Sequence, residues 1–583
     1  MVKMTGGEVV ALMLKQEGVE KVFGIVDGTY LGLFAAFRKH GIDLVTPRHE
    51  ACAVHMAGAY ARLTGRLGVA IASNGPGVAN ALPGVAVENG EGNRVLLITS
   101  TRRVGIGYPD RGGAYQYFNQ VGVIKPMSKW SGAVPSFSRI PEFMKRAFRK
   151  SFQGRPGVVH VDIPENFMNA KNATGAIPAP VSYRRVAPIT PDRDEVERAA
   201  ALLAGAALPI IHAGSGVVHA GAFDELRRVA ELLHAPVCTS WGGRGALPEQ
   251  HELAVSMVYV DLNDRVRNEA DVVLALGSRF GETDWWGKAP NWAQPPKQKL
   301  IQVDVDEETL GLNKPAEMTV LADAKVFLGE LIEALEARRD TMPLEGRRRA
   351  VAAYNEAKAK QRAKLDKSLD DLSAPLVTAH VAKACQEFFD DDAVFVVDGG
   401  NTTIWGMFYH EARTPNTLLS TPKFGMLGAG VAQALGAAVA RPDKQVYCII
   451  GDGAMGFNQQ EIETAVRNGL RVVYLVCCDK QWGMVKMTQQ FAFRPWKTLI
   501  MKSLGPGETI NADLHEIAYD KLAESMGAHG ERVREPGELR PALERSRASG
   551  KPAVIHVDVD PVKHMWAPNL MTFKKMHQEP EGK

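Results

Sequence analysis

The chain has 583 residues, and its length, composition and charge already argue against several classes of protein. A single hydrophobic core stops growing at about 250 to 300 residues, so we expect three domains. The hydrophobic fraction of 45% and the charged fraction of 23% are typical of globular proteins and argue against disorder. Lys and Arg number 69 against 66 Asp and Glu, and the basic residues are scattered, so we expect no nucleic-acid partner. No apolar run approaches about 18 residues and no signal-peptide pattern opens the chain, so we expect no membrane association and a cytoplasmic location.

In the first third of the chain, helical patterns alternate with short β-branched runs. These runs predict strands at 22–25, 44–46, 69–73, 95–99 and 158–162. Alternation of this kind predicts a parallel sheet that is covered by helices on both faces. We therefore expect a first domain over residues 1–175, and the Pro-rich stretch that follows it reads as a linker.

The same pattern returns twice further along the chain. Strands are predicted at 209–212, 235–240, 272–276 and 299–305, and again at 394–398, 445–451, 472–478 and 553–557. They indicate a central domain over 190–340 and a third domain over 374–565, with a tail at 566–583. The charged, Ala-rich stretch 341–373 is predicted to be a helical linker. The expected fold class is α/β, with three doubly wound parallel sheets in series.

The sharpest chemical pattern lies at the ends of two consecutive strands of the third domain. Gly451, Asp452 and Gly453 end one predicted strand, and Asp479 ends the next. Ligands bind at such strand ends, and tight glycine turns let main-chain N–H groups approach phosphates. The two carboxylates, with a nearby main-chain carbonyl, make an all-oxygen site of the kind that Mg²⁺ prefers together with diphosphate oxygens. The same tripeptide ends strands in many other α/β proteins, so taken alone it also fits a plain turn.

The spacing of these residues resembles the thiamine diphosphate (ThDP) fingerprint of the acetolactate synthase, pyruvate oxidase and benzoylformate decarboxylase superfamily. In that fingerprint the second strand ends in two Asn, whereas here Asp479 replaces the usual Asn ligand and retains an oxygen. The resemblance implies that Asp452, Asp479 and the carbonyl of Gln481 bind Mg²⁺. It implies cofactor contacts for Gly451, Asp452, Gly453, Ala454, Asp479, Gln481, Trp482, Gly483 and Met484. It also implies that the three domains are the pyrimidine-binding, central and diphosphate-binding domains of that superfamily.

Glu50 follows a predicted strand and opens a helix in the first domain. In the same superfamily a Glu at this place hydrogen-bonds N1′ of the aminopyrimidine ring and favours the tautomer that makes N4′ an internal base. The resemblance therefore makes Glu50 the first catalytic residue. Taken alone, Glu50 would equally be an acidic residue that the macrodipole favours at a helix N-terminus.

Further matches extend over almost the whole chain. Residues 73–80 (SNGPGVAN) resemble the SGPGxxN turn of the superfamily, with Asn74 as an addition. Gln116 stands where an A-F-Q segment places a Gln near the reactive carbon of the cofactor. In residues 425–428 (GMLG), Leu427 corresponds to the side chain that wedges the cofactor into its bent form. The resemblance thus adds Gln116 as a catalytic residue and Gly28, Pro76, Asn80, Gly399, Asn401, Thr402, Gly425 and Leu427 as cofactor contacts.

The nearest overall resemblance is to acetolactate synthase large subunits, although several positions depart from their pattern. Thr488 stands where an aromatic residue favours 2-oxobutyrate, and Gly28 stands where pyruvate decarboxylases carry a catalytic Asp. Residues 256–259 (SMVY) replace the stretch that helps to hold FAD, so we expect no flavin. Two isolated histidines, His55 and His564, are expected to be structural.

The resemblance implies a ThDP- and Mg²⁺-dependent 2-oxo acid decarboxylase or carboligase, which is a homodimer or homotetramer with its active sites at the subunit interface. The long basic segment 489–509 could close over the site and offer Arg494, Lys497 or Lys502 to an anionic substrate. An acyl-CoA would also suit these cations, so a 2-hydroxyacyl-CoA lyase or oxalyl-CoA decarboxylase-like enzyme is the main alternative. An inactive scaffold on the same fold is a third hypothesis, against which the presence of Glu50 argues.

Overall fold

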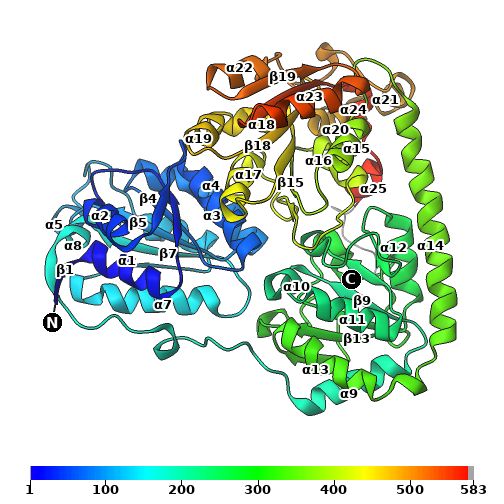
Figure 1. The fold of residues 1–583 in the computed structure, drawn as a ribbon, viewed down its shortest axis with the longest axis horizontal. Helices are drawn as coiled ribbons and strands as arrows, with labels where there is room; N and C mark the ends of the chain where they lie inside the picture. The colour runs from blue at the N-terminus through cyan, green and yellow to red at the C-terminus, as the bar shows by residue number, and fades with distance from the viewer. Residues whose placement is uncertain (1, 576–583) are drawn as a thin grey trace.

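The computed structural model describes residues 2–575 and consists of three α/β domains, each built around one six-stranded sheet (Figure 1). In each sheet the neighbouring strands are parallel. Parallel neighbours need crossover connections, which the intervening helices supply. The predicted fold class, α/β with three doubly wound parallel sheets, is confirmed.

The N-terminal sheet has the strand order β3-β2-β4-β5-β7-β6. Its strands are β2 (Lys21–Gly24), β3 (Asp43–Val45), β4 (Gly68–Ala72), β5 (Val95–Thr101), β6 (Trp130–Ala133) and β7 (Val158–Pro164). The helices of this domain are α1 (Gly6–Gln16), α2 (Leu31–His40), α3 (Glu50–Thr64), α4 (Pro76–Glu91), α5 (Val104–Gly107), α6 (Gln120–Ile124), α7 (Ile140–Phe152) and α8 (Glu165–Asn169). Strands β1 (Val2–Thr5) and β8 (Lys171–Thr174) form a separate antiparallel ribbon.

The central sheet has the order β11-β10-β9-β12-β13-β14. Its strands are β9 (Pro209–Ala213), β10 (Val237–Thr239), β11 (Ala254–Val255), β12 (Val272–Leu276), β13 (Lys299–Asp304) and β14 (Met318–Leu321). The helices are α9 (Arg193–Gly205), α10 (Ser215–Ala220), α11 (Phe223–Leu233), α12 (Val260–Glu269) and α13 (Ala324–Glu336).

The C-terminal sheet has the order β16-β15-β17-β18-β20-β19. Its strands are β15 (Val394–Asp398), β16 (Leu418–Leu419), β17 (Val446–Gly451), β18 (Val472–Cys478), β19 (His529–Val533) and β20 (Ala553–Asp558). The helices are α15 (Ala379–Phe388), α16 (Asn401–Tyr409), α17 (Ala429–Ala440), α18 (Asp452–Asn458), α19 (Glu461–Arg467), α20 (Gly483–Phe493), α21 (Pro495–Met501), α22 (Tyr519–Ser525), α23 (Pro536–Ala548), α24 (Pro561–Met565) and α25 (Leu570–Lys575). The last eight residues of the predicted tail, 576–583, lie outside the described residues.

Helix α14 (Leu344–Asp366) connects the central and C-terminal domains and runs along the right edge of the molecule in Figure 1. It lies within the stretch that the sequence marks as a helical linker, and the domain boundaries themselves stay a prediction. Arg347 anchors the helix, because its buried guanidinium donates to the main-chain oxygens of Leu203, Ala204, Ala206 and Leu233. These carbonyls lie at the C-terminal ends of α9 and α11, where the helix dipole favours a cation.

The N-terminal and C-terminal domains pack on one another through α3 and α17. Gly436 permits this close contact, because a Cβ atom at that position would lie 2.5 Å from the main-chain oxygen of Met56. Buried side chains of the two domains form one continuous hydrophobic cluster that includes Phe23 and Ile450. This apolar packing therefore fixes the position of the N-terminal domain relative to the C-terminal domain.

A buried ion pair ties the central domain to the C-terminal domain. The guanidinium of Arg244 pairs with Glu249 and also donates to the main-chain oxygens of Met407 and His410. The hydroxyl of Ser256 donates to the same Glu249 carboxylate. The segment 256–259, which the sequence singles out for its departure from a flavin-holding pattern, therefore begins inside this domain contact.

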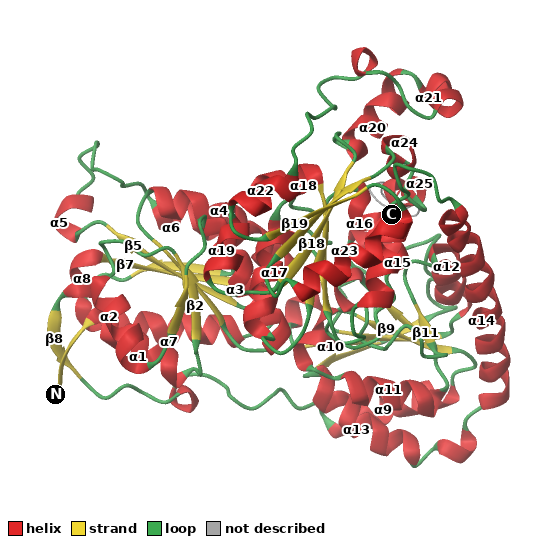
Figure 2. Cartoon of the chain, turned by 45° about the horizontal axis from the view of Figure 1, so that its top comes forward, coloured by secondary structure: helices red, strands yellow, loops and turns green. Residues whose placement is uncertain are grey.

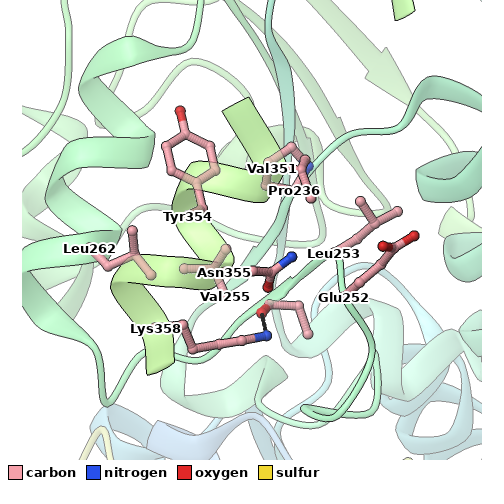
Figure 3. A pocket seen from close by; sticks show the side chains of 10 residues that line it. Pro236, Glu252, Leu253, Val255, Leu262, Val351, Tyr354, Asn355 and Lys358 are labelled. Atoms are coloured by element: carbon pink, nitrogen blue, oxygen red, sulfur yellow. Dashed lines mark hydrogen bonds between the residues drawn. The ribbon is translucent and has the colours of Figure 1, made fainter. Parts of the chain in front are cut away.

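A small pocket lies between α14 and the edge of the central sheet (Figure 3). Its volume is about 10 Å³, which is the space that one water molecule needs. Lys358 lines it and donates to the main-chain oxygen of Ala254 at 3.3 Å. The pocket is too small for a metabolite. None of the helices between residues 2 and 575 combines the length and the apolarity needed to cross a membrane.

Candidate active site

Three neighbouring strands of the C-terminal sheet end at, or directly before, an aspartate at the same edge. Strand β15 ends at Asp398, β17 ends at Gly451 directly before Asp452, and β18 ends directly before Asp479. Strand β17 lies between the other two in the sheet. Because the carboxyl ends of parallel strands form the ligand-binding edge of an α/β sheet, the sequence places these side chains in one region.

Asp452 and Asp479 form a buried pair of carboxyl groups that lack a cationic partner. Burial, and then the charge of Asp479, raises the pKa of Asp452 to about 7, and burial raises the pKa of Asp479 to about 7 as well. Within residues 2–575, no Lys or Arg pairs with either carboxylate, and the Nε2 atom of His564 lies 3.9 Å from Asp479 Oδ2. Burial lowers the pKa of His564 to about 4, so this ring is neutral. A divalent cation would supply the missing charge, and the donor set therefore fits Mg²⁺.

The amide of Asn401 lies beside this pair and has the surroundings of a ligand contact. Asn401 is buried, and neither its oxygen nor its nitrogen has a hydrogen-bond partner among the described residues. A Cβ atom on Gly483 would lie 2.7 Å from Asn401 Nδ2 and 3.0 Å from Asp479 Oδ2, so the amide and the carboxylate both lie against this glycine. Buried polar groups are normally hydrogen-bonded, so this amide fits a site for a polar ligand such as a diphosphate.

Other glycines bring the remaining predicted contacts together. A Cβ atom on Gly451 would lie 3.0 Å from Thr402 Oγ1, and one on Gly453 would lie 2.6 Å from the ring of Trp482. We call the assembled group the C-terminal half-site. It consists of Gly399, Asn401, Thr402, Gly451, Asp452, Gly453, Ala454, Asp479, Gln481, Trp482, Gly483 and Met484.

The loop before α17 carries two further predicted contacts. Gly425 and Gly428 have φ angles of +68° and +88° and enclose Leu427, which is half-buried against the main hydrophobic cluster. A Cβ atom on Gly428 would lie 2.4 Å from Phe457 Cβ, so the loop is pressed against α18, the helix that begins at Asp452. The loop thus borders the C-terminal half-site, and the wedge role of Leu427 stays a prediction.

Asp398 adjoins the C-terminal half-site, although it was not predicted from the sequence. Its carboxylate accepts hydrogen bonds from the N–H groups of Gly399 at 2.6 Å and Gly430 at 2.8 Å. It therefore joins the turn after β15 to the start of α17. Burial raises the pKa of Asp398 to about 6. The available signal was an acidic residue that ends a strand directly before two glycines.

A second group of predicted residues lies in the N-terminal domain, at the starts of α3 and α4. Glu50 opens α3, is 8% exposed and accepts a hydrogen bond from Asn80 Nδ2 at 3.1 Å. A Cβ atom on Gly77 would lie 3.2 Å from Glu50 Oε1, and Pro76 begins the same helix α4. The carboxylate is therefore packed closely between two helix N-termini.

Gln116 lies on an exposed loop that contacts the turn before α4. Its φ angle of +53° is in the left-handed region, and its main-chain oxygen accepts a hydrogen bond from Asn74 Nδ2 at 3.0 Å. Gly28 lies on the exposed loop after β2, and a Cβ atom there would meet nothing within 4 Å. We call Gly28, Glu50, Pro76, Asn80 and Gln116 the N-terminal half-site.

A contact between domains fixes the approach to Glu50, and sequence reasoning missed it. Glu461 of α19 is fully buried and accepts the N–H of Arg48 at 3.0 and 3.1 Å, at its two carboxylate oxygens. The two residues are 413 positions apart, so no local pattern could reveal the contact. The C-terminal domain therefore holds the main chain two residues before Glu50.

The two half-sites lie in different domains of the chain. In the part of the chain that the structure describes, no hydrogen bond or ion pair links Glu50 or Gln116 to the C-terminal half-site. Helix α3 lies in the blue domain of Figure 1 and α18 in the orange domain.

The segment that follows Asp479 projects from the C-terminal domain as α20 and α21 (Figure 2). Two of its three predicted substrate cations already have partners. Lys497 pairs with Glu508 at 2.6 Å, and the Nζ atom of Lys502 lies 4.8 Å from the ring centroid of Trp566. Arg494 lies at the start of α21 and is exposed.

A cavity of about 1110 Å³ lies between the N-terminal and central domains. Its volume is that of a site for a sizeable small molecule. Glycine and serine residues at strand ends of the central sheet line it, together with cations that include Arg155, Arg279 and Lys423. The segment 256–259 is not part of its lining. The expected absence of a flavin stays a prediction.

Three family models match the chain, one in each domain. The N-terminal TPP binding domain of thiamine pyrophosphate enzymes matches residues 4–123, their central domain matches 196–331, and their C-terminal TPP binding domain matches 398–557. The first match contains Glu50 and Gln116, and the last contains Asp452 and Asp479. Both half-sites therefore lie in segments that match TPP binding domains. The roles of their individual side chains stay a prediction.

Curated relatives align over nearly the full length of the chain. The acetolactate synthase large subunit of Corynebacterium glutamicum is 30% identical over 97% of this chain and 88% of its own length. The acetolactate synthase isozyme 3 large subunit of Escherichia coli is 29% identical over 97% and 96%. The probable acetolactate synthase large subunit of Methanococcus aeolicus is 29% identical over 96% and 92%. The predicted resemblance is confirmed, and the chain belongs to the thiamine pyrophosphate enzymes as a relative of the acetolactate synthase large subunits.

Proposed function

We propose that this chain is a Mg²⁺-dependent ThDP carboligase that decarboxylates a 2-oxo acid and joins the remaining fragment to a second carbonyl compound. The observation that carries the proposal is the buried pair of Asp452 and Asp479 beside the unpartnered amide of Asn401. The pair needs a cation, and the amide needs a polar ligand. The likeness to acetolactate synthase large subunits over nearly the whole chain supports a 2-oxo acid as the substrate.

In this proposal the C-terminal half-site holds the metal and the diphosphate. Asp452, Asp479 and the main-chain oxygen of Gln481 bind Mg²⁺, while Asn401 and the glycine turn at Gly399 bind phosphate oxygens. Bound ThDP supplies an electron sink, which allows a carbon–carbon bond beside a carbonyl to be broken or made.

In this proposal the N-terminal half-site controls the proton on ring nitrogen N1′ of the cofactor. Glu50 hydrogen-bonds the ring nitrogen N1′ and holds a proton there, and Asn80 fixes the carboxylate that does so. Gly425 accepts a hydrogen bond from the 4′-amino group through its main-chain oxygen, and Leu427 packs against the cofactor. Helices α20 and α21 would exclude water from the site on closing over it.

A second copy of the chain completes the site. Glu50 and the C-terminal half-site belong to different domains, and the packing of α3 on α17 already fixes how those domains sit within one chain. We therefore propose a homodimer or homotetramer in which the N-terminal half-site of one subunit faces the C-terminal half-site of the other.

A substrate panel tests this proposal. Purified protein with ThDP and Mg²⁺ is incubated with pyruvate, larger 2-oxo acids and oxalyl-CoA, and CO₂ and hydroxyketone products are quantified. We expect CO₂ release from a 2-oxo acid together with a new carbon–carbon bond in the product. Turnover of the acyl-CoA alone would move the chain to the 2-hydroxyacyl-CoA lyase alternative. No turnover by protein that binds ThDP would favour the inactive scaffold.

A further inference from the structure

A buried carboxyl group lies near the carboxyl end of strand β7 in the N-terminal sheet, outside the proposed site. Asp162 of β7 is 4% exposed, and within residues 2–575 no cationic side chain pairs with it. Its Oδ1 atom accepts hydrogen bonds from Thr99 Oγ1 at 2.7 Å and from Gln120 Nε2 at 2.9 Å. Burial raises the pKa of Asp162 to about 7, so an unpaired buried carboxyl is kept here at a cost in stability.

Gln120 links this carboxyl group to the turn before α4. It is the first residue of α6 and is 2% exposed. Its Nε2 atom donates to Asp162 and to the main-chain oxygen of Ser100, both at 2.9 Å, and its Oε1 atom accepts the N–H of Gly75 at 2.8 Å. Because a main-chain N–H can bond only to the amide oxygen, the orientation of the Gln120 amide is fixed.

The turn that Gln120 holds is in contact with Gln116. Gly75 has a φ angle of +64°, and a Cβ atom on it would lie 2.7 Å from the main-chain oxygen of Gln116. The neighbouring Asn74 donates its N–H to Ser100 Oγ at 3.0 Å and its Nδ2 to the same Gln116 oxygen. Gln116 has a left-handed backbone, which costs energy in a non-glycine residue and persists only where its surroundings hold it.

We propose that Gln120 and Asp162 are positioning residues that hold Gln116 in place for the reaction by fixing the turn at residues 73–77. Asp162 holds Gln120, Gln120 holds Gly75, and the turn holds the Gln116 loop. Gln116 is on an exposed loop and has no other anchor of this kind in the described chain. The inference rests on the proposed function of Gln116 and adds the residues that fix the position of its side chain.

The test removes the Gln120 amide and compares that variant with one that removes the amide of a matched glutamine in the central domain. Gln120→Met keeps the size of the side chain and deletes its three hydrogen bonds. Gln302 is also 2% exposed, donates to the main-chain oxygens of Ser278 and Thr309 and accepts the N–H of Gly311. Gln302→Met therefore also removes two donated hydrogen bonds and one accepted hydrogen bond, in the central domain. Both variants are checked for folding by their melting temperatures.

Two kinetic results are expected. Gln120→Met lowers kcat for the best 2-oxo acid by about 100-fold, which is the effect of displacing a catalytic group by about 1 Å, while Gln302→Met leaves kcat at the wild-type value. The double variant Gln116→Ala/Gln120→Met is no slower than Gln116→Ala alone, because Gln120 acts only through Gln116. Additive losses, or equal kcat in Gln120→Met and Gln302→Met, would overturn the inference.

A conservative pair at Asp162 keeps the test decisive if Gln120→Met does not fold. Asp162→Asn retains an oxygen that can accept from Thr99 and Gln120, and we expect it to retain most of the wild-type kcat. Asp162→Val removes that acceptor, and we expect it to lose kcat as Gln120→Met does. Equal kcat in these two variants would contradict the proposed anchoring.

Hydrogen–deuterium exchange gives a readout that needs no turnover. The N–H of Gly75 and the segment 112–119 should exchange about tenfold faster in Gln120→Met than in wild type, since one hydrogen bond is worth about this factor. Gln302→Met should leave both unchanged, and unchanged exchange in Gln120→Met would contradict the anchoring. A wild-type protein without turnover would contradict the proposed function, whereas the exchange result would still decide whether Gln120 holds the turn.

Discussion

At the scale of single residues, the Glu50 carboxylate is fixed by an amide rather than neutralised by a cation. Asn80 donates a hydrogen bond to one of its oxygens. The other oxygen lies so close to Gly77 that a Cβ atom there would be 3.2 Å away. No Lys, Arg or His forms an ion pair with Glu50 in the described part of the chain. A change at Glu50 should therefore affect chemistry much more than folding.

Replacing Glu50 by Gln isolates this role. The amide keeps the size and one oxygen but loses the negative charge that favours protonation of N1′. We expect hydrogen–deuterium exchange at C2 of bound ThDP to slow by at least about 10² to 10⁴-fold, the usual contribution of a general base. The affinity for ThDP, measured in parallel, should change little. Exchange at the wild-type rate in Glu50→Gln would move the activating role to another residue.

Residues that contact ligands are easier to predict from the sequence than residues that fix the main chain around the site. Asp452 and Asp479 are carboxylates at strand ends, a place where side chains meet ligands. Asp398 and Glu461 act on main-chain N–H groups instead, and the contact of Glu461 with Arg48 spans 413 positions. Such contacts depend on how distant segments pack, so a single sequence does not disclose them.

At the scale of elements, Arg347 joins three helices. One guanidinium from α14 satisfies the last carbonyls of α9 and α11, which would otherwise be buried without partners. The side chain is fully buried, and burial lowers its pKa to about 10, so it stays charged at neutral pH. The position of α14 against the central domain therefore depends on this residue.

Arg347→Met should destabilise the protein by about 2 to 4 kcal/mol, because four buried main-chain oxygens lose a charged donor. Arg348→Met is the matched control, since Arg348 is the next residue of the same helix and is exposed. Urea unfolding of both variants measures the difference. Equal free energies of unfolding for the two would show that Arg347 does not anchor the helix.

In the three six-stranded sheets, the strands that sequence reasoning missed share one position. Strands β6, β11, β14, β16 and β19 all lie at sheet edges. Along β14 buried and exposed residues alternate, and only the last residue of β19 is buried. A central parallel strand reads as a continuous apolar run because both of its faces are covered, and an edge strand lacks that run.

At the scale of the whole molecule, the proposed site needs two chains. Mixing two inactive variants tests this arrangement. In a heterodimer of Glu50→Gln and Asp452→Ala, one site carries both changes and the other carries neither. Random reassociation of equal amounts should restore about a quarter of the wild-type activity. If no activity returns although the subunits exchange, both half-sites belong to the same chain.

The central domain leads to a separate prediction about cofactor content. The segment 256–259 departs from the pattern that helps to hold FAD and takes part in the contact with the C-terminal domain instead. We therefore expect the purified protein to be colourless. A flavin absorption band at near-stoichiometric occupancy would contradict this interpretation of the central domain.

The metal site carries the central claim, and calorimetric titration of ThDP in the presence of Mg²⁺ tests it most directly. Asp452→Ala should abolish Mg²⁺-dependent ThDP binding while the melting temperature stays close to that of wild type, because the carboxyl is buried at a cost that its removal relieves. Asp558→Asn is the control, since Asp558 ends strand β20 of the same sheet but pairs with Arg532. This control should bind ThDP as the wild-type protein does. An unchanged affinity for ThDP in Asp452→Ala would contradict the account.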